Sequence, residues 1–166
     1  MTESKNVRPK NEDVIKDFFT GEALDNILNL ISFLRENKMN PTCSSKSSWI
    51  SRNKKRVVCR FNIDNGTLRV TPIIGNYSAD SLSDEHKKIV WAKVEDRVHG
   101  CWNCEGGTHC SHLGLSSNYG MKIVFGKKYD ENVCGQSICF INPNSCEVEC
   151  IKELIKLRKS FAQMEN

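Results

Sequence analysis

The sequence has no long apolar run, because its most apolar segment, residues 27–34, is interrupted by Asn29 and Ser32. A membrane-spanning helix needs about 20 apolar residues in succession, so none is expected. The polar N-terminus, residues 1–13, lacks the apolar centre of a secretory signal peptide. We therefore expect a cytoplasmic protein with no membrane partner.

Other features are scarce as well. The chain has no internal repeat and no low-complexity tract, and its 24 Lys and Arg against 20 Asp and Glu leave a net charge of +4. So small an excess does not predict a nucleic-acid partner. The phosphate-binding Gly-Lys-Ser/Thr loop, His-Glu-x-x-His and Gly-x-Ser-x-Gly are all absent. Many catalytic sites have no local signature, so enzymatic activity stays undecided.

The patterns that are present predict one α+β domain. Residues 1–13 are expected to be a disordered tail, and residues 14–163 a single domain with a cysteine loop at residues 100–120. Apolar residues at helical spacing predict helices from Gly21 to about Asn37, from Asp84 to about Val98, and from Ser145 onward. Strands are expected between them. The fold class is therefore an antiparallel sheet packed with N-terminal, middle and C-terminal helices.

The clearest local pattern is a β-hairpin centred on Asn65-Gly66. Apolar and polar residues alternate on both sides of this dipeptide, which favours a two-residue turn. Such a turn pairs Ile63 with Leu68 and Phe61 with Val70, so both strands present their apolar residues to one face.

The opposite face of the hairpin carries Arg60 and Arg69, which with Trp102 are candidate ligand-binding residues. The two arginines could form a basic patch for phosphate or an acidic ligand together with Arg52, Lys54, Lys55 and Arg56. A solvated sheet face is the simpler interpretation, because the net charge of the chain is low.

Cysteine is the most informative residue type in the chain. Nine cysteines are present, and seven of them follow residue 100. An odd number leaves one thiol unpaired in any disulfide scheme, and cytosolic thiols stay reduced. Cys101 and Cys104 form a Cys-x-x-Cys motif, which lets two thiolates bind one tetrahedral ion from a single turn, and Cys110 is close enough in sequence to join them. The pattern predicts a structural zinc site.

The fourth ligand is open on sequence grounds, with the candidates Cys134, His99, His109 and His112. Reduced thiols in a glycine-rich loop are the main alternative to a metal site, followed by a redox-active pair. A catalytic zinc with a bound water is a further alternative, in which Glu105 would be the nearest base. Cys59, Cys139 and Cys150 are predicted to be core residues.

Several segments together resemble a group of small bacterial proteins of uncharacterised activity that carry a Cys-x-x-Cys-x5-Cys loop. The segments are residues 20–24, 33–39, 101–110, 123–127, 132–134, 142–143 and 149–152. The resemblance spans about residues 18–160 and implies no activity. It does imply that Cys134 belongs with the loop cysteines, which makes it the first choice as fourth ligand.

The sequence thus predicts a zinc-stabilised domain that binds a small molecule or a protein partner. An enzyme or a thiol or metal sensor that uses the cysteine loop is one alternative. A weak nucleic-acid-binding module is the other.

Overall fold

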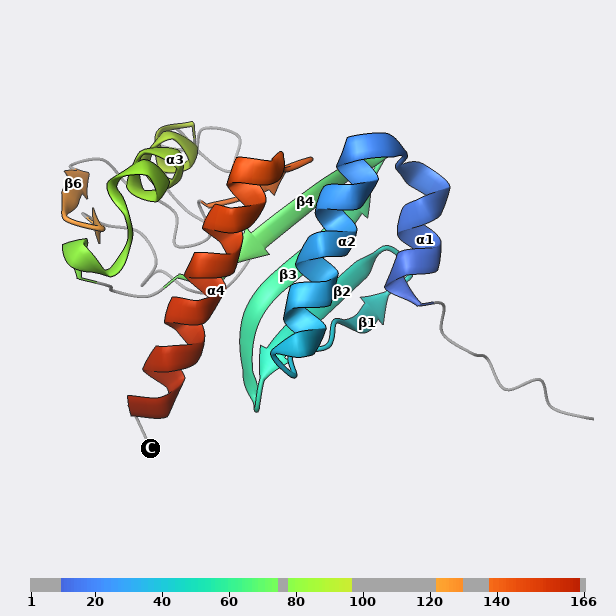
Figure 1. Ribbon diagram of the computed structural model, residues 1–166, viewed down its shortest axis with the longest axis horizontal. Helices are drawn as coiled ribbons and strands as arrows, with labels where there is room; N and C mark the ends of the chain where they lie inside the picture. The colour runs from blue at the N-terminus through green and yellow to red at the C-terminus, as the bar shows by residue number, and fades with distance from the viewer. Residues whose placement is uncertain (1–9, 75–77, 97–121, 130–137, 165–166) are drawn as a thin grey trace, which may run out of the picture.

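An antiparallel sheet of five strands is the centre of the computed structural model, which describes residues 10–74, 78–96, 122–129 and 138–164. The strand order is β1-β2-β3-β4-β7, so the fifth strand comes from a distant part of the chain. Helices α2 and α4 lie side by side over one face of this sheet (Figure 1). A two-stranded sheet, β5–β6, lies against α3. The arrangement confirms the predicted α+β class.

The elements, in chain order, are α1 (Asn11–Phe18), α2 (Gly21–Glu36), β1 (Thr42–Ser45), β2 (Ser48–Asn53), β3 (Arg56–Asp64), β4 (Thr67–Pro72), the short 3-10 helix η1 (Ala79–Ser81), α3 (Asp84–Glu95), β5 (Lys122–Val124), β6 (Lys127–Tyr129), β7 (Phe140–Ile141) and α4 (Ser145–Met164). Side chains of α4 are described as far as Ser160. In the described parts of the chain, no helix has both the length and the apolar character needed to cross a membrane.

The β3–β4 hairpin has the register that the sequence predicts. Ile63 pairs with Leu68 and Phe61 with Val70. Asn65 and Gly66 have φ angles of 49° and 73°, the left-handed pair that a two-residue type I′ turn requires. Pro72 ends β4, where its missing amide hydrogen does not interrupt the sheet.

One row of large side chains crosses the sheet and forms the floor of the core. Trp49 pairs with Phe61, Phe61 with Val70, and Val70 with Phe140, so the row joins β2, β3, β4 and β7. All four residues are at most 3% exposed. A bulge between Ser51 and Arg52 shifts the β2–β3 register near the end of the pair. The pattern of simple alternation therefore fails there, and Val58 is buried beside Cys59.

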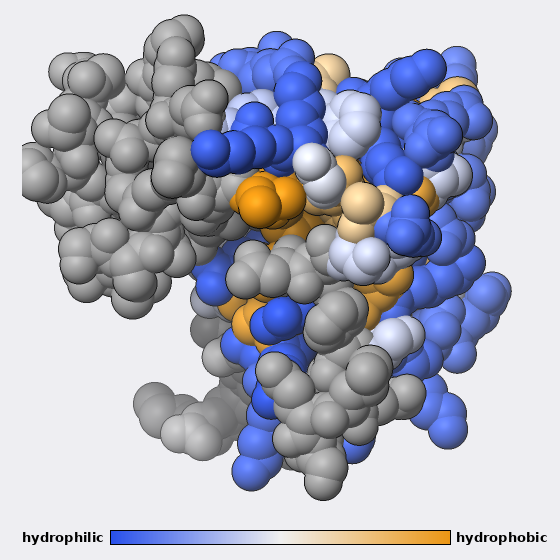
Figure 2. Space-filling model, turned by 90° about the vertical axis from the view of Figure 1, so that its left-hand side faces the viewer, coloured by the Kyte–Doolittle hydropathy of each residue, from blue (hydrophilic) through white to orange (hydrophobic). Residues whose placement is uncertain are grey.

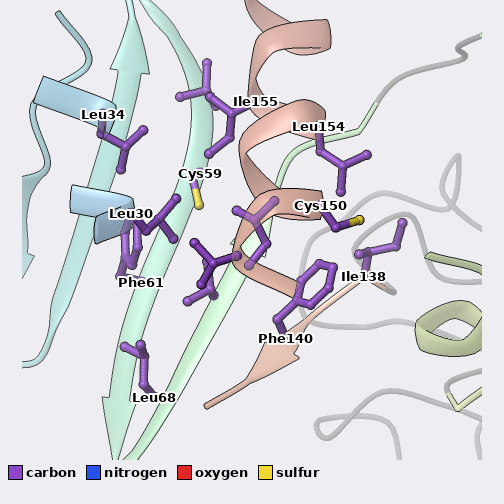
Figure 3. Close-up of a cluster of buried hydrophobic side chains, with 14 of the residues drawn as sticks. Leu30, Leu34, Cys59, Phe61, Leu68, Ile138, Phe140, Cys150, Leu154 and Ile155 are labelled. Atoms are coloured by element: carbon purple, nitrogen blue, oxygen red, sulfur yellow. The ribbon is translucent and has the colours of Figure 1, made fainter. Parts of the chain in front are cut away.

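Helices α2 and α4 cover this row with apolar side chains. In Figure 3, Leu30 and Leu34 of α2 and Ile155 of α4 lie beside Phe61 and Cys59 of the sheet. On α2, Leu30 is fully buried, whereas Leu28 is half-buried.

Helix α4 is buried on a second side as well. In Figure 3, Leu154 and Cys150 point away from the sheet, and Cys150 lies near Ile138. The Cys150 thiol donates to the backbone carbonyl of His86 in α3 at 3.7 Å. The helix therefore packs on both the sheet and α3, which explains why so many of its residues are apolar.

Of the four α-helices, α3 and α4 have side-chain caps at their N-termini, and α1 and α2 do not. The Ser83 hydroxyl accepts from the His86 amide at 3.3 Å and caps α3. At α4, Asn144 and Glu147 cap each other's amides at 2.9 and 3.0 Å, a reciprocal capping box. Thr20 precedes α2 but makes no such side-chain bond.

Helix α1 was not predicted from the sequence. Ile15 is 1% exposed, and the Arg35 guanidinium on α2 forms an ion pair with Glu12. Asn11 to Asp13, which were assigned to the tail, form the first turn of this helix. The remainder of the predicted tail, residues 1–9, lies outside the described residues.

Candidate functional site

The residues predicted to bind zinc all lie outside the described residues, as do the other loop candidates. They are Cys101, Cys104, Cys110, Cys134, His99, His109, His112, Glu105 and Trp102. Among residues 10–74, 78–96, 122–129 and 138–164, no group of three or more His, Cys, Asp or Glu side chains could hold a metal ion. The structure therefore defines the frame to which the two cysteine-bearing segments are attached.

Both segments begin or end at the same end of the β5–β6 hairpin. Residues 97–121 lead into β5 at Lys122, and residues 130–137 follow β6 at Tyr129. Lys122 and Tyr129 are paired in this two-stranded sheet. Cys134 is five residues beyond Tyr129, and five residues of extended chain span up to about 17 Å. The chain length therefore allows Cys134 to reach the cysteines of the preceding segment.

The hairpin is held against α3 by one hydrogen bond and one lysine. The Trp91 indole Nε1 donates to the Val124 carbonyl at 2.8 Å. The Lys127 ammonium forms an ion pair with Glu95 and lies 5.6 and 5.5 Å from the ring centres of Trp91 and Tyr129. These contacts, the hairpin clamp, fix β5–β6 to the helix that precedes the first cysteine-bearing segment.

The turn of this hairpin needs an unusual backbone. Phe125 and Gly126 have φ angles of 46° and 83°, again a type I′ pair. A positive φ is rare for a bulky residue, and Phe125 is 3% exposed, so burial of its ring offsets the strain. A Cβ on Gly126 would lie 2.8 Å from the Ala79 Cβ, so the turn rests directly on η1.

Apolar side chains also reach the surface at this end of the molecule. Figure 2, which views the side that carries α3 and β6 in Figure 1, shows apolar described residues among hydrophilic ones. On the β5–β6 hairpin, the Ile123 side chain is 63% exposed.

Tyr129 is the titratable group that this frame perturbs most clearly. Burial raises its pKa from 10.0 to about 12, and the negative charge of Glu95 adds to the shift. The residue is 7% exposed. Its hydroxyl has no hydrogen-bond partner within the described ranges. A buried hydroxyl without a partner destabilises the fold, because it loses its water.

We expect Tyr129→Phe to leave stability unchanged or higher at pH 8 and to reduce alkaline destabilisation. The folded-state pKa lies above the unfolded value, so the folded state keeps its proton more tightly. Ionisation of Tyr129 therefore does not affect the free energy of unfolding below about pH 10. As the pH rises from about 10 to about 12, the free energy of unfolding decreases, because the unfolded state loses the phenol proton first. Urea denaturation at pH 8 and pH 11 measures both effects. A larger loss of stability between these pH values in the variant would contradict the assignment.

Two of the described cysteines, Cys59 and Cys150, do not have the properties of reactive thiolates. Burial raises the pKa of Cys59 well above its ordinary range, and that of Cys150 to about 12, with Glu147 and Glu153 adding to the second shift. Both are fully buried, which confirms their prediction as core residues. Cys139 was also predicted to be a core residue but is only half-buried, as is Cys43, and Cys146 is exposed. A nucleophilic or redox cysteine needs a lowered pKa, so Cys59 and Cys150 are structural.

The two arginines of the predicted ligand face do share the outer face of the sheet. Arg60 pairs with Thr71 and Asn62 with Arg69, so the arginines are diagonal neighbours on β3 and β4. Arg60 is exposed, whereas Arg69 forms an ion pair with Asp64 at 3.1 Å.

The hairpin clamp was missed by sequence reasoning. The available signal was Trp91, which lies beside the buried stripe of Val90 and Val94 on α3 and is only half-buried. The residues that it contacts are more than 30 positions away, and no local pattern specifies such a pairing.

Comparisons with known proteins do not assign these residues to a family. The function must therefore be inferred from the chain's own residues and geometry. No protein-family model, curated protein or solved structure matches the chain.

Proposed function

We propose that this chain is a zinc-stabilised α+β binding domain of the cytoplasm, in which Cys101, Cys104, Cys110 and Cys134 hold one zinc ion. The Cys-x-x-Cys-x5-Cys spacing carries the proposal, since three thiolates so close in sequence can bind one tetrahedral ion. The pairing of Lys122 with Tyr129 supports Cys134 as the fourth ligand, because the segments that contain the four cysteines join neighbouring backbone positions.

The role of the ion in this proposal is structural. Residues 100–120 contain five glycines and few large apolar side chains, so packing alone gives this segment little stability. A zinc ion bound by four thiolates would replace that packing and fix the segment between α3 and β5. The hairpin clamp supports this role, because it provides a rigid attachment on either side. The domain would then present a surface to a small molecule or a protein.

Metal content tests the proposal directly. The chain is purified without a metal-affinity column and analysed for zinc, and its free thiols are counted before and after chelation. We expect about one zinc per chain, four thiols protected until chelation, and loss of zinc with a lower melting temperature in Cys104→Ser. Cys146→Ser is the matched control, because its exposed thiol lies on α4 outside the proposed site, and it should keep its zinc.

Two outcomes would overturn the proposal. One is a metal-free protein whose thiols all react freely once it is unfolded, with the same melting temperature in Cys104→Ser. The other is zinc that stays bound in Cys134→Ser with an open coordination position, which would favour a catalytic or sensing site instead.

A further inference from the structure

The positive charge of the chain is concentrated in one segment. Residues 37–63 contain seven Lys and Arg and no Asp or Glu: Lys38, Lys46, Arg52, Lys54, Lys55, Arg56 and Arg60. The rest of the chain has 17 basic and 20 acidic residues, a net charge of −3. The overall charge of +4 is therefore the sum of a strongly basic segment and an acidic remainder.

This segment folds into the first three strands of the sheet and the turns that join them. All seven basic residues are exposed. Four of them, Arg52, Lys54, Lys55 and Arg56, lie at the β2–β3 turn, where Lys54 has a φ of 54°. Five of the cations, the four at this turn and Arg60, thus lie at one end of the sheet and along β3, whereas Lys46 lies in the β1–β2 turn at the opposite end.

The outer face of the sheet extends this basic surface with further hydrogen-bond donors. Trp49, Ser51, Cys59 and Phe61 are buried on the helix side, so their neighbours Ile50, Arg52, Arg60 and Asn62 face outward. Ser48 pairs with Asn62 and Thr71 with Arg60 on the same face. Helices α2 and α4 lie over the opposite face (Figure 1), so neither of them covers the outer one.

The same face has no aromatic platform for unpaired bases. The aromatic residues of β1 to β4 are Trp49 and Phe61, and both are buried. Single-stranded nucleic acids bind largely through stacking of bases on exposed aromatic rings, combined with charge. A surface of arginine, lysine, serine, threonine and asparagine instead matches the phosphates of a duplex, whose bases are already stacked and paired.

We propose that the basic sheet face, defined as the outer face of β2–β4 together with the β2–β3 turn, binds the phosphate backbone of double-stranded nucleic acid without reading base sequence. Double-stranded nucleic acid is thus the partner that we assign to this surface of the proposed binding domain. The binding does not depend on the zinc ion. The basic sheet face also favours the nucleic-acid-binding alternative that the sequence left open, which the low charge of the whole chain had disfavoured.

The test is a fluorescence-anisotropy titration of the full chain, with its zinc content recorded, against a duplex of about 20 base pairs, roughly two helical turns. We expect binding at low salt that weakens steeply as salt rises, with similar affinity for duplexes of unrelated sequence. Arg52→Gln/Arg60→Gln should weaken binding roughly 10-fold or more near 0.1 M salt and reduce the slope of log K against log salt by about 2.

The matched control removes two exposed charges elsewhere. Lys16 on α1 and Lys88 on α3 are both exposed, and Lys16→Gln/Lys88→Gln lowers the net charge by the same amount. This variant should bind within about twofold of the unaltered chain. Lys54→Gln/Lys55→Gln, in the exposed turn, is a second test variant if the strand arginines prove necessary for folding, which thermal denaturation decides.

Four results would overturn the inference. They are no binding to any duplex at low salt, equal weakening by test and control variants, tighter binding to a single strand of the same length, and loss of binding on a change of base sequence alone. A chain that binds duplexes but contains no zinc would support this inference while removing the proposed zinc site, so the two proposals fail separately.

Discussion

Replacing Phe140 by alanine is expected to lower the free energy of unfolding by about 3–5 kcal/mol. The ring is fully buried at the end of the row that crosses the sheet, opposite Val70. The Lys93 ammonium lies 5.7 Å from the ring centre and forms an ion pair with Glu147 at 2.7 Å. Truncation would therefore leave a cavity where β4, β7, α3 and α4 meet. Urea denaturation followed by circular dichroism measures the loss.

Ile141→Ala is the matched control for this prediction. Ile141 is the next residue of β7, is 37% exposed and faces the other side of the sheet, beside Arg69. Its truncation should cost less than about 1 kcal/mol. Equal losses in the two variants would contradict the orientation of β7.

Gly126→Ala is expected to destabilise the protein by about 2–5 kcal/mol, for two separable reasons. Its φ of 83° disfavours any L side chain by about 1–2 kcal/mol. The added methyl group would also lie 2.8 Å from the Ala79 Cβ, and such overpacking costs about 1–3 kcal/mol. Thermal and urea denaturation report the total.

A second glycine separates the two reasons. Gly66 has a similar φ of 73° in the same type of turn, but a Cβ there would meet no atom within 4 Å. Gly66→Ala should therefore show the backbone contribution alone. Adding Ala79→Gly to Gly126→Ala should restore part of the steric contribution. Equal effects of alanine at positions 66 and 126 would show that the hairpin does not rest on η1.

The local parts of the fold were predictable because their causes are local. The Asn65-Gly66 turn and the alternation around it determine the register of β3 and β4, and Ser83 precedes an amphipathic run that it can cap. Helix α1 was missed because it is short and is stabilised by contact with α2, through Ile15 and the Glu12–Arg35 ion pair. The bulge that buries Val58 is likewise set by the pairing with β2.

The candidate site likewise has a part that was predictable from the sequence and a part that was not. Cysteine spacing predicts a metal site without any structure, and the ligands stay a prediction because they lie outside the described residues. The clamp of Trp91 and Lys127 was not predictable, since its contacts join α3 to a hairpin more than 30 residues later. The basic segment was visible in the sequence as a candidate phosphate-binding patch, but the low net charge of the whole chain favoured a solvated sheet face instead.

The pairing of β4 with β7 makes the middle of the chain an insertion within a hairpin. Val70 pairs with Phe140, and the chain leaves the sheet after Pro72 and returns to it at Phe140. Residues 73–139, which include α3 and β5–β6, thus form the connection between two neighbouring strands. Because doubling the length of such a connection costs only about 0.6 kcal/mol in loop entropy, changes of length in it should destabilise the sheet little as long as α3 keeps its contacts with α4.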